Sequence, residues 1–403
     1  MRVCGIVAEY NPFHNGHAWQ IAEIRRRMGE DCPIVCCMSG NFVQRGEAAI
    51  IDKFSRAEMA VRGGADLVIE LPSPYSLSSA EAFAENAVML LENAGCTDLF
   101  FGSECGDTAA LEEIAAVLLE HETVAATLAH LESGISYAAA RERALYARIR
   151  EKAALIQSPN NILGVEYCKA LLKRKSAMRP HALPRRGPEH DAALPDDSFC
   201  SASALRALFL KEGCGDALGA YLPQSSLDIL RREHSNGRAP VSLDAHPRMV
   251  LSALRRLSRE ELGLLPGASE GLEHRLYQAL RENNRLSDAA AAAKTKRYAY
   301  SRIRRMMVCA FLGITAEEVC RAPVYLRVLA FGHRGRPLLK AISTNEHALP
   351  LLVKPAHCRL LSPNAEDAFR RESERTDLYQ MLIPAYETVF PGSEYRQTPF
   401  YLK

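Results

Sequence analysis

The chain has 403 residues, more than one domain usually contains, so we expect two domains. Hydrophobic residues make up 48% and charged residues 24%, which is typical of a globular protein with a sizeable core and excludes a disordered chain. The net charge of +2 excludes a uniformly basic surface, so any nucleic-acid-binding surface must be a local patch.

The twelve cysteines favour a reducing compartment. No two of them have the two-residue spacing of zinc knuckles and redox sites, and Cys32, Cys36 and Cys37 lie in or beside a predicted strand. We therefore expect buried free thiols, no metal-ligating residues and a cytoplasmic location. The chain enters a strand at once, without a signal peptide. No apolar run approaches the roughly 18 residues of a membrane span, so no membrane partner is expected.

The first hundred residues alternate between strand-like and helix-like patterns. Short apolar runs predict strands at 2–8, 33–38, 67–71 and 97–102. Helical spacing predicts helices at 18–28, 54–62 and 79–93. Glycines follow the last two helices, as they do at many helix ends. This alternation predicts the α/β fold class, with a parallel sheet covered by helices on both faces.

The remaining chain is predicted to be mainly helical. Helical patterns cover 107–152, 159–175 and 201–211. Residues 180–200 contain four prolines and little periodicity, which predicts an exposed loop. Beyond residue 220 the sequence is rich in Leu, Ala and Arg, with one strand candidate at 324–331. We therefore divide the chain into an α/β domain at 1–215 and a mainly helical, basic region at 216–403.

The strongest functional signal lies between the first predicted strand and the first helix. It is a His-x-Gly-His loop formed by His14, Asn15, Gly16 and His17. The carboxyl end of a parallel strand is where α/β proteins bind ligands, and the next helix offers N–H groups and a positive dipole end to an anion. Gly16 leaves room for a phosphate, and both imidazoles can donate to its oxygens. The alternative is a polar turn with incidental histidines.

A second candidate opens the helix at 201–211. Ser201 or Ser203 can cap this helix, and their hydroxyls with the free N–H groups can hold a leaving pyrophosphate. Arg206 would add a fixed positive charge. Alone, this segment is more often an ordinary capped helix, but beside the histidine loop it becomes informative.

Together the two elements resemble the adenylyltransferase superfamily that combines a His-x-Gly-His loop with a Ser-Ser-x-x-(Leu/Ile)-Arg-type loop. Longer segments resemble a narrower family, the bacterial tRNA(Met) cytidine acetate ligases. These segments are 8–17, 39–47 (SGNFVQRGE), 52–53, 64–72 (GADLVIELP), 101–104 (FGSE), 158–164 (SPNNILG), 304–305 and 324–331. They are spread over nearly the whole chain, and the agreement is weakest at 185–191.

The resemblance implies a Rossmann-like nucleotidyltransferase domain and a ligase that uses ATP. Such an enzyme joins acetate to ATP as acetyl-adenylate and transfers the acetyl group to the exocyclic amine of the wobble cytidine of elongator tRNA(Met), giving N4-acetylcytidine. It implies catalytic roles for His14 and His17. The ATP-binding residues implied by the resemblance, with the second candidate element added, are Val7, Ala8, Glu9, Tyr10, Asn11, Pro12, Phe13, His14, Asn15, Gly16, His17, Gln20, Gly102, Asn160, Arg185 or Arg186, Ser201, Ser203 and Arg206. ATP chemistry also predicts Mg²⁺, held mainly by the nucleotide and water.

Asp52 and Lys53 come just before a predicted helix. They have two equally weighted interpretations. They could join the ATP site, or they could be a helix cap and a solvated charge.

A basic segment at 294–305 is the candidate tRNA-binding surface, with six basic residues and no acidic ones. Its basic residues are Lys294, Lys296, Arg297, Arg302, Arg304 and Arg305. Tyr298 and Tyr300 could stack on bases. A second basic cluster is formed by Arg327, Arg334, Arg336 and Lys340. The alternative is a solvated amphipathic helix.

Two other functions are compatible with parts of the sequence. A small-molecule adenylyltransferase without an RNA substrate would explain the N-terminal half but needs no basic second half. A non-catalytic RNA-binding protein would explain the basic segment but needs no histidine loop. Acetate-dependent pyrophosphate exchange, measured with and without tRNA, distinguishes these functions from the ligase.

Overall fold

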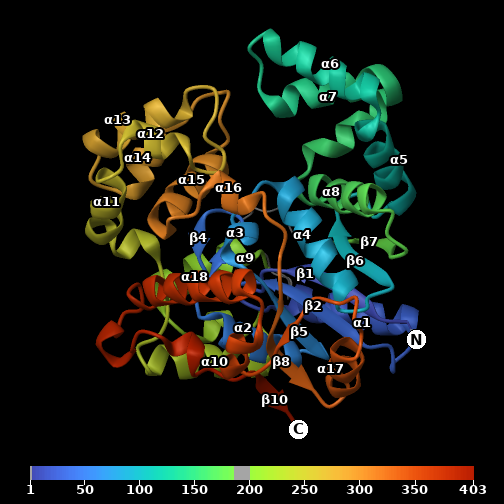
Figure 1. The fold of residues 1–403 in the computed structure, drawn as a ribbon, viewed down its shortest axis with the longest axis vertical. Coiled ribbons are helices and arrows are strands. Elements are labelled where there is room, and N and C mark those ends of the chain that lie inside the picture. Colours follow the sequence, from blue (N-terminus) through green and yellow to red (C-terminus); the bar gives the residue numbers. More distant parts are fainter. Residues whose placement is uncertain (1, 186–199) are drawn as a thin grey trace.

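A single mixed sheet forms the centre of the computed structural model, which describes residues 2–185 and 200–403 (Figure 1). The strand order is β10-β8-β5-β2-β1-β6-β7, with β9 beside β8. The strands are β1 (Cys4–Ala8), β2 (Ile34–Ser39), β5 (Leu67–Leu71), β6 (Asp98–Ser103), β7 (Arg179–Pro184), β8 (Leu326–Gly332), β9 (Leu351–Leu352) and β10 (Phe400–Leu402). A separate hairpin pairs β3 (Phe42–Val43) with β4 (Glu47–Ala48).

The predicted α/β fold class is confirmed. Strands β5, β2, β1, β6 and β7 run parallel to one another, whereas β8 is antiparallel to β5, and β9 and β10 run parallel to β8. All six residues of β2 are buried because both faces of the sheet are covered. Val35 and Cys37 face one hydrophobic core, whereas Ile34, Cys36 and Met38 face the other. The alternation of strand side chains therefore serves two cores at once.

Helices cover both faces of the sheet. One core packs α4 (Ala80–Asn93) and α8 (Pro159–Arg174) on the sheet. The other packs α1 (Asn15–Met28), α2 (Lys53–Arg62), α9 (Ala202–Glu212) and α10 (Gln224–Ser235). Helix α1 begins three residues earlier than predicted, because His14 caps it and its first turn is polar.

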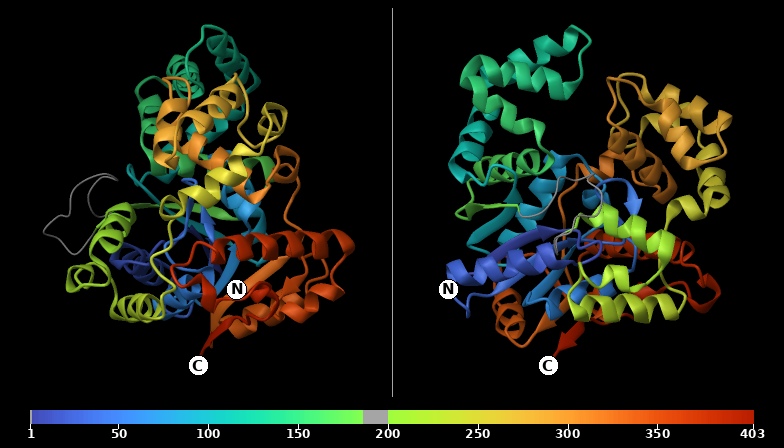
Figure 2. Two further views of the ribbon diagram at one scale, coloured as in Figure 1. Left: turned by 90° about the vertical axis from the view of Figure 1, so that its left-hand side faces the viewer. Right: turned by 180° about the vertical axis from the view of Figure 1, so that it is seen from behind.

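Two helical arms rise from the same end of the sheet (Figures 1 and 2). One arm contains α5 (Thr108–Leu119), α6 (His121–Glu132) and α7 (Tyr137–Ile149). The other contains α11 (Pro247–Arg255), α12 (Arg259–Gly263), α13 (Leu272–Glu282), α14 (Leu286–Ala293) and α15 (Tyr300–Leu312), around a third hydrophobic core. None of the described helices is alone long and apolar enough to cross a membrane. The pair α5 and α6 would reach that length and composition together, but it bends by 73°.

The C-terminal part of the chain returns to the sheet. It adds β8, β9 and β10, with α17 (Gly335–Ser343) and α18 (Pro363–Gln380) packed nearby. The region from residue 216 is therefore not a purely helical body, since the sheet itself crosses the predicted division after residue 215. That division into two domains stays a prediction.

The predicted loop at 180–200 is wrong for its first residues, which form β7. This strand is at the edge of the sheet, where one side of the backbone needs no partner, so Pro180 and Pro184 can be accommodated. Arg186 lies outside the described residues. The cysteine expectation is confirmed, since all twelve are free thiols and nine of them are buried.

Candidate active site

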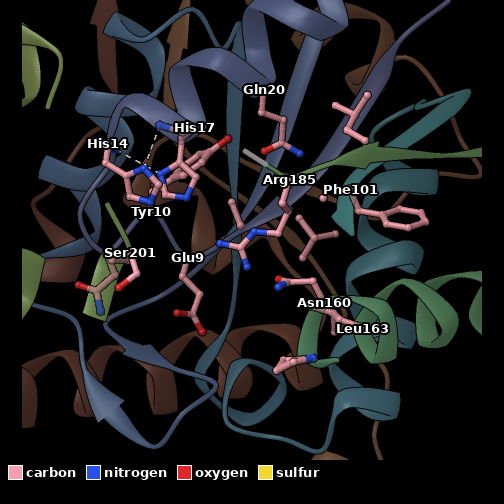
Figure 3. Close-up of a pocket in the computed structure, with 18 of the residues that line it drawn as sticks. Glu9, Tyr10, His14, His17, Gln20, Phe101, Asn160, Leu163, Arg185 and Ser201 are labelled. Carbon is pink, nitrogen blue, oxygen red and sulfur yellow. Dashed lines mark hydrogen bonds between the residues drawn. The ribbon is translucent and has the colours of Figure 1, made fainter. Parts of the chain in front are cut away.

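A cavity of about 320 Å³ opens at the carboxyl ends of β1, β6 and β7 (Figure 3). The starts of α1, α4, α8 and α9 and the β3–β4 hairpin complete its walls. Thirteen residues predicted for the ATP site line it: Val7, Ala8, Glu9, Tyr10, Asn11, His14, Gly16, His17, Gln20, Gly102, Asn160, Arg185 and Ser201. The fold therefore brings most of the predicted site into one cavity, while the role of each residue stays a prediction.

The loop after β1 is held from behind by a buried arginine. Tyr10 has a positive φ of 46°, which is unusual for a bulky residue. The fully buried Arg56 of α2 fixes the turn by donating to the carbonyl oxygens of Glu9 at 2.6 Å and Ser39 at 3.1 Å. Asn11 Oδ1 accepts a hydrogen bond from the backbone N–H of Ile50 at 2.8 Å. These hydrogen bonds fix this wall of the cavity without the help of a ligand.

The two histidines form one stacked unit at the N-terminus of α1. Their ring centroids are 3.8 Å apart, with an angle of 27° between the planes. His14 Nδ1 accepts from the backbone N–H of Gly16 at 3.0 Å, and His17 Nδ1 accepts from the backbone N–H of His14 at 3.2 Å. Since both Nδ1 atoms are acceptors, each neutral ring carries its proton on Nε2. A Cβ on Gly16 would lie 2.9 Å from His14 Cε1, so glycine is needed here.

Both imidazoles are held neutral. Burial, with the nearby charge of Arg185, lowers the pKa of His14 to about 3. Burial, together with His14 and Arg185, lowers the pKa of His17 well below its usual value. Above pH 5 the pair therefore offers two N–H donors without a net charge. Such donors can stabilise the negative charge that develops on a phosphate oxygen in the transition state.

Arg185 places a positive charge in the cavity beside the histidines (Figure 3). It follows β7, and a Cβ on Gly102 would lie 3.3 Å from its Cγ, so Gly102 gives the arginine room. Asn160 opens α8, and its Nδ2 donates to Glu104 at 2.6 Å. This bond fixes the Asn160 side chain, so its Oδ1 points in one direction.

The second predicted phosphate-binding element is only partly at the cavity. Ser201 lines it and caps α9, with Oγ accepting from the N–H of Ala204 at 3.2 Å. Ser203 and Arg206 are not among the lining residues. Arg206 instead donates to the Asn11 carbonyl at 3.1 Å and to Glu47 at 3.1 Å. In this structure the arginine joins the β1 loop to the β3–β4 hairpin.

Three other predicted ATP-site residues support the loop from outside the cavity. Phe13 is fully buried against the ring of Tyr10, with ring centroids 4.9 Å apart. Asn15 donates from its backbone N–H to the Tyr221 carbonyl at 2.9 Å. Pro12 follows a cis peptide bond from Asn11.

Several lining residues carry no clear signal in the sequence. The polar ones are Gln44 and Arg45, at the turn of the β3–β4 hairpin. An apolar wall comes from Ala80, Phe83, Phe101, Leu163 and Tyr167. The only signal for Gln44 and Arg45 was their place in the 39–47 segment that carries the family resemblance. The hairpin strands have two residues each, too few to show a periodicity.

Asp52 and Lys53 do not join the cavity. Asp52 caps α2, with Oδ1 accepting from the N–H of Phe54 at 2.8 Å, so its capping interpretation is confirmed. Lys53 is fully buried, and its Nζ lies 2.7 Å from Glu70 and 2.8 Å from Glu394. Both interpretations of Lys53, a site residue and a solvated charge, are wrong.

The basic segment 294–305 divides into an exposed part and a buried part. Lys294, Lys296 and Arg297 are exposed in the link between α14 and α15. Arg304 is buried and paired with both carboxylate oxygens of Asp244, at 3.2 and 3.0 Å. Tyr298 is buried with its hydroxyl bonded to a backbone carbonyl, so the expectation that it stacks on bases is wrong. The prediction of a tRNA surface therefore rests on the exposed part.

Two further arginines of the segment are tied to neighbouring backbone. Arg302 donates to the Gly267 carbonyl at 3.0 Å, and Arg305 donates to the Gln44 carbonyl at 3.2 Å. The second basic cluster is not one surface, because Arg327 is buried and paired with Glu394 at 3.1 Å. Burial of these cations was invisible in the sequence, where their acidic partners are far away.

Comparison with known proteins agrees with this geometry. The family model of HIGH nucleotidyl transferases matches residues 1–390. The tRNA(Met) cytidine acetate ligase of Acetivibrio thermocellus is 36% identical over 98% of this chain and 99% of its own. That of Fervidobacterium nodosum is 40% identical over 86% and 82%.

Solved structures show the same arrangement over the full length. Thermotoga maritima TmcAL bound with alpha-thio ATP has a TM-score of 0.93 and 32% identity, covering all of both chains. The apo form of TmcAL has a TM-score of 0.94 and 33% identity. The predicted family and the Rossmann-like nucleotidyltransferase fold are confirmed. The chain belongs to the tRNA(Met) cytidine acetate ligase family, within the HIGH nucleotidyl transferases.

Proposed function

We propose that the chain is an ATP-dependent ligase that joins acetate to a cytidine of tRNA(Met). It activates acetate as acetyl-adenylate and transfers the acetyl group to the exocyclic amine of the wobble cytidine in elongator tRNA(Met). The observation that carries the proposal is the stacked pair of neutral imidazoles at the N-terminus of α1. Each ring accepts a backbone hydrogen bond at Nδ1, so its proton is on Nε2, where it can be donated to a ligand. The family membership supports the acid and the RNA substrate.

In the first step an acetate oxygen attacks the α-phosphorus of ATP, and pyrophosphate leaves with the electrons of the broken P–O bond. The protein has to position the reactants and stabilise the growing negative charge. His14 and His17 donate to phosphate oxygens through Nε2, and Arg185 contributes a positive charge beside them. The attack of acetate and the departure of pyrophosphate transfer no proton, so the neutral imidazoles act here as hydrogen-bond donors.

Mg²⁺ fits this scheme as an ion carried by the phosphates. Among the described residues no group of three or more His, Cys, Asp or Glu side chains is arranged to hold a metal. Glu9 is the one carboxylate among the lining residues that the structure describes. When bound, Mg²⁺ would be held by phosphate oxygens and water, and it would reduce the repulsion between the triphosphate and acetate.

The exposed basic link supports the RNA half of the reaction. Lys294, Lys296 and Arg297 project from the arm formed by α11–α15, which rises beside the cavity end of the sheet (Figure 2). Cations in such a position attract the phosphates of an RNA without reading its sequence. A tRNA substrate would place the enzyme in the cytoplasm.

The test is incubation with ATP, labelled acetate and total bacterial tRNA, followed by nucleoside analysis and by acetate-dependent pyrophosphate exchange without tRNA. We expect label in acetylated cytidine, and exchange that needs acetate. Loss of one charge-stabilising donor in His14→Ala should slow exchange by about 10²–10³-fold. Exchange without acetylated tRNA would favour a small-molecule adenylyltransferase, and absence of both would leave only an RNA-binding role.

A further inference from the structure

The cavity contains a carboxylate where a triphosphate is proposed to bind. Glu9, just after β1, is the only acidic residue among its described lining residues. A negative charge in the cavity repels ATP, so it weakens nucleotide binding unless it has another task. Figure 3 shows the Glu9 carboxyl group turned away from the two imidazoles, toward the other end of the cavity.

The β3–β4 hairpin holds this carboxylate in place. Glu9 Oε1 accepts from the backbone N–H of Gln44 at 3.0 Å. Within the described parts of the chain, the structure shows no hydrogen bond to Oε2. One oxygen therefore fixes the orientation, and the other is left to meet a substrate.

The same hairpin contacts the arm that carries the basic link. The Gln44 carbonyl accepts from Arg305 Nη1 at 3.2 Å. Gly46 packs so closely on α15 that an added Cβ would lie 2.4 Å from the carbonyl carbon of Arg304. The backbone of Gln44 thus bonds to Glu9 through its N–H and to Arg305 of α15 through its C=O. The Glu9 end of the cavity therefore lies beside the hairpin that contacts this arm.

We propose that Glu9 accepts the proton released when the cytidine amine attacks acetyl-adenylate. This inference rests on the proposed function. The amine nitrogen bonds to the acetyl carbon, and the C–O bond to the phosphate breaks. AMP leaves with that electron pair, and the amine proton moves to Glu9, which releases it to water. Without a base, the neutral but weakly basic amine would have to acquire a positive charge in the transition state.

The charges around Glu9 suit a base. Burial raises the pKa of Glu9, while Arg206, the Gln44 amide and Arg45 act in the opposite direction. The charged or titratable groups that face it come from the hairpin, α2, α8 and α9: Arg45, Glu47, Arg56, Tyr167 and Arg206. Raising the pKa of a carboxylate strengthens it as a base.

The test separates the two half-reactions. Glu9→Gln keeps the shape of the side chain and an oxygen for the Gln44 N–H, but removes the base. Because Glu9 also lines the nucleotide cavity, we expect acetate-dependent pyrophosphate exchange without tRNA to change far less than transfer does. Single-turnover transfer from preformed acetyl-adenylate to tRNA should slow by about 10²–10⁴-fold, the usual share of a general base. Glu9→Asp, which keeps a carboxylate, should restore part of the transfer rate.

A pH profile adds a readout that a structural role would not change. Wild-type transfer should rise with pH as Glu9 loses its proton and then level off, whereas transfer by Glu9→Gln should lack that rise. The control Glu23→Gln removes an acid of α1 outside the cavity and should behave as wild type. Parallel loss of exchange and transfer, as expected of a Mg²⁺ ligand or a folding defect, would overturn the proposal, and so would unchanged transfer. Absence of both activities in the wild type would instead refute the proposed function.

Discussion

The fold can be tested most stringently at a buried cluster of charged side chains. Lys53, at the start of α2, lies between Glu70 of β5 and Glu394 near the C-terminus, and Arg327 of β8 binds Glu394 from the other side. All four side chains are at most 1% exposed. The cluster therefore joins the parallel sheet to the last third of the chain. Arg56, which fixes the Glu9 turn, lies on the same helix as Lys53.

The perturbation is Lys53→Met, which fills similar space but removes the cation. Two carboxylates are then left buried with only Arg327 to balance them. Breaking a buried ion pair from one side costs about 3–5 kcal/mol. An unfolding entropy of about 2.1 cal/mol/K per residue over the whole chain converts this loss to a fall in Tm of about 4–6 °C.

The matched control is Lys152→Met, which breaks the exposed pair with Glu113. Its two side chains are 52% and 44% exposed, so the pair contributes at most about 1 kcal/mol. Calorimetry at pH 8 should therefore show a small change for Lys152→Met and a large one for Lys53→Met. Equal Tm values for the two variants would refute the reasoning.

The pH dependence gives a second check on the same variant. Burial raises the pKa of Glu70 to about 7, and the attraction of Lys53 opposes that rise. Without Lys53 the pKa of Glu70 rises further, and protonation removes the uncompensated charge. The stability lost in Lys53→Met should therefore grow as the pH rises above 7, where Glu70 is ionised in the wild type, and be smaller and nearly constant below pH 7, where Glu70 is protonated in both proteins. Unfolding free energies measured at several pH values test this sign.

Three further outcomes follow from the site and the arms. Because the pKa of His14 is about 3, the rate of pyrophosphate exchange should show no titration of an imidazole between pH 5 and 8. Gly16→Ala should slow exchange by up to about 100-fold by displacing the His14 ring, whereas Gly263→Ala, in open space, should not. Lys294→Glu combined with Lys296→Glu should weaken tRNA binding and reduce its salt dependence, with pyrophosphate exchange intact in filter-binding and exchange assays on the same sample.

Local patterns were enough to predict the parallel strands and the histidine loop. Strands β2 and β5 are buried on both faces, so their apolar runs stand out from the amphipathic helices that follow. Strand β7 was missed because its prolines, which argue against a central strand, are tolerated at an edge. Strand β10 has three partly buried residues, too few for a recognisable pattern.

What the sequence could not show is where its cations find partners. Arg304 and Lys294 look alike in a basic segment, yet one is buried against Asp244, sixty positions away, and the other is exposed. Lys53 meets a glutamate from the far end of the chain. A buried charge needs a fixed partner, and long-range folding decides which basic residues have one. The cations left exposed by that pairing are therefore the ones to test for RNA binding, and the buried ones the ones to test for stability.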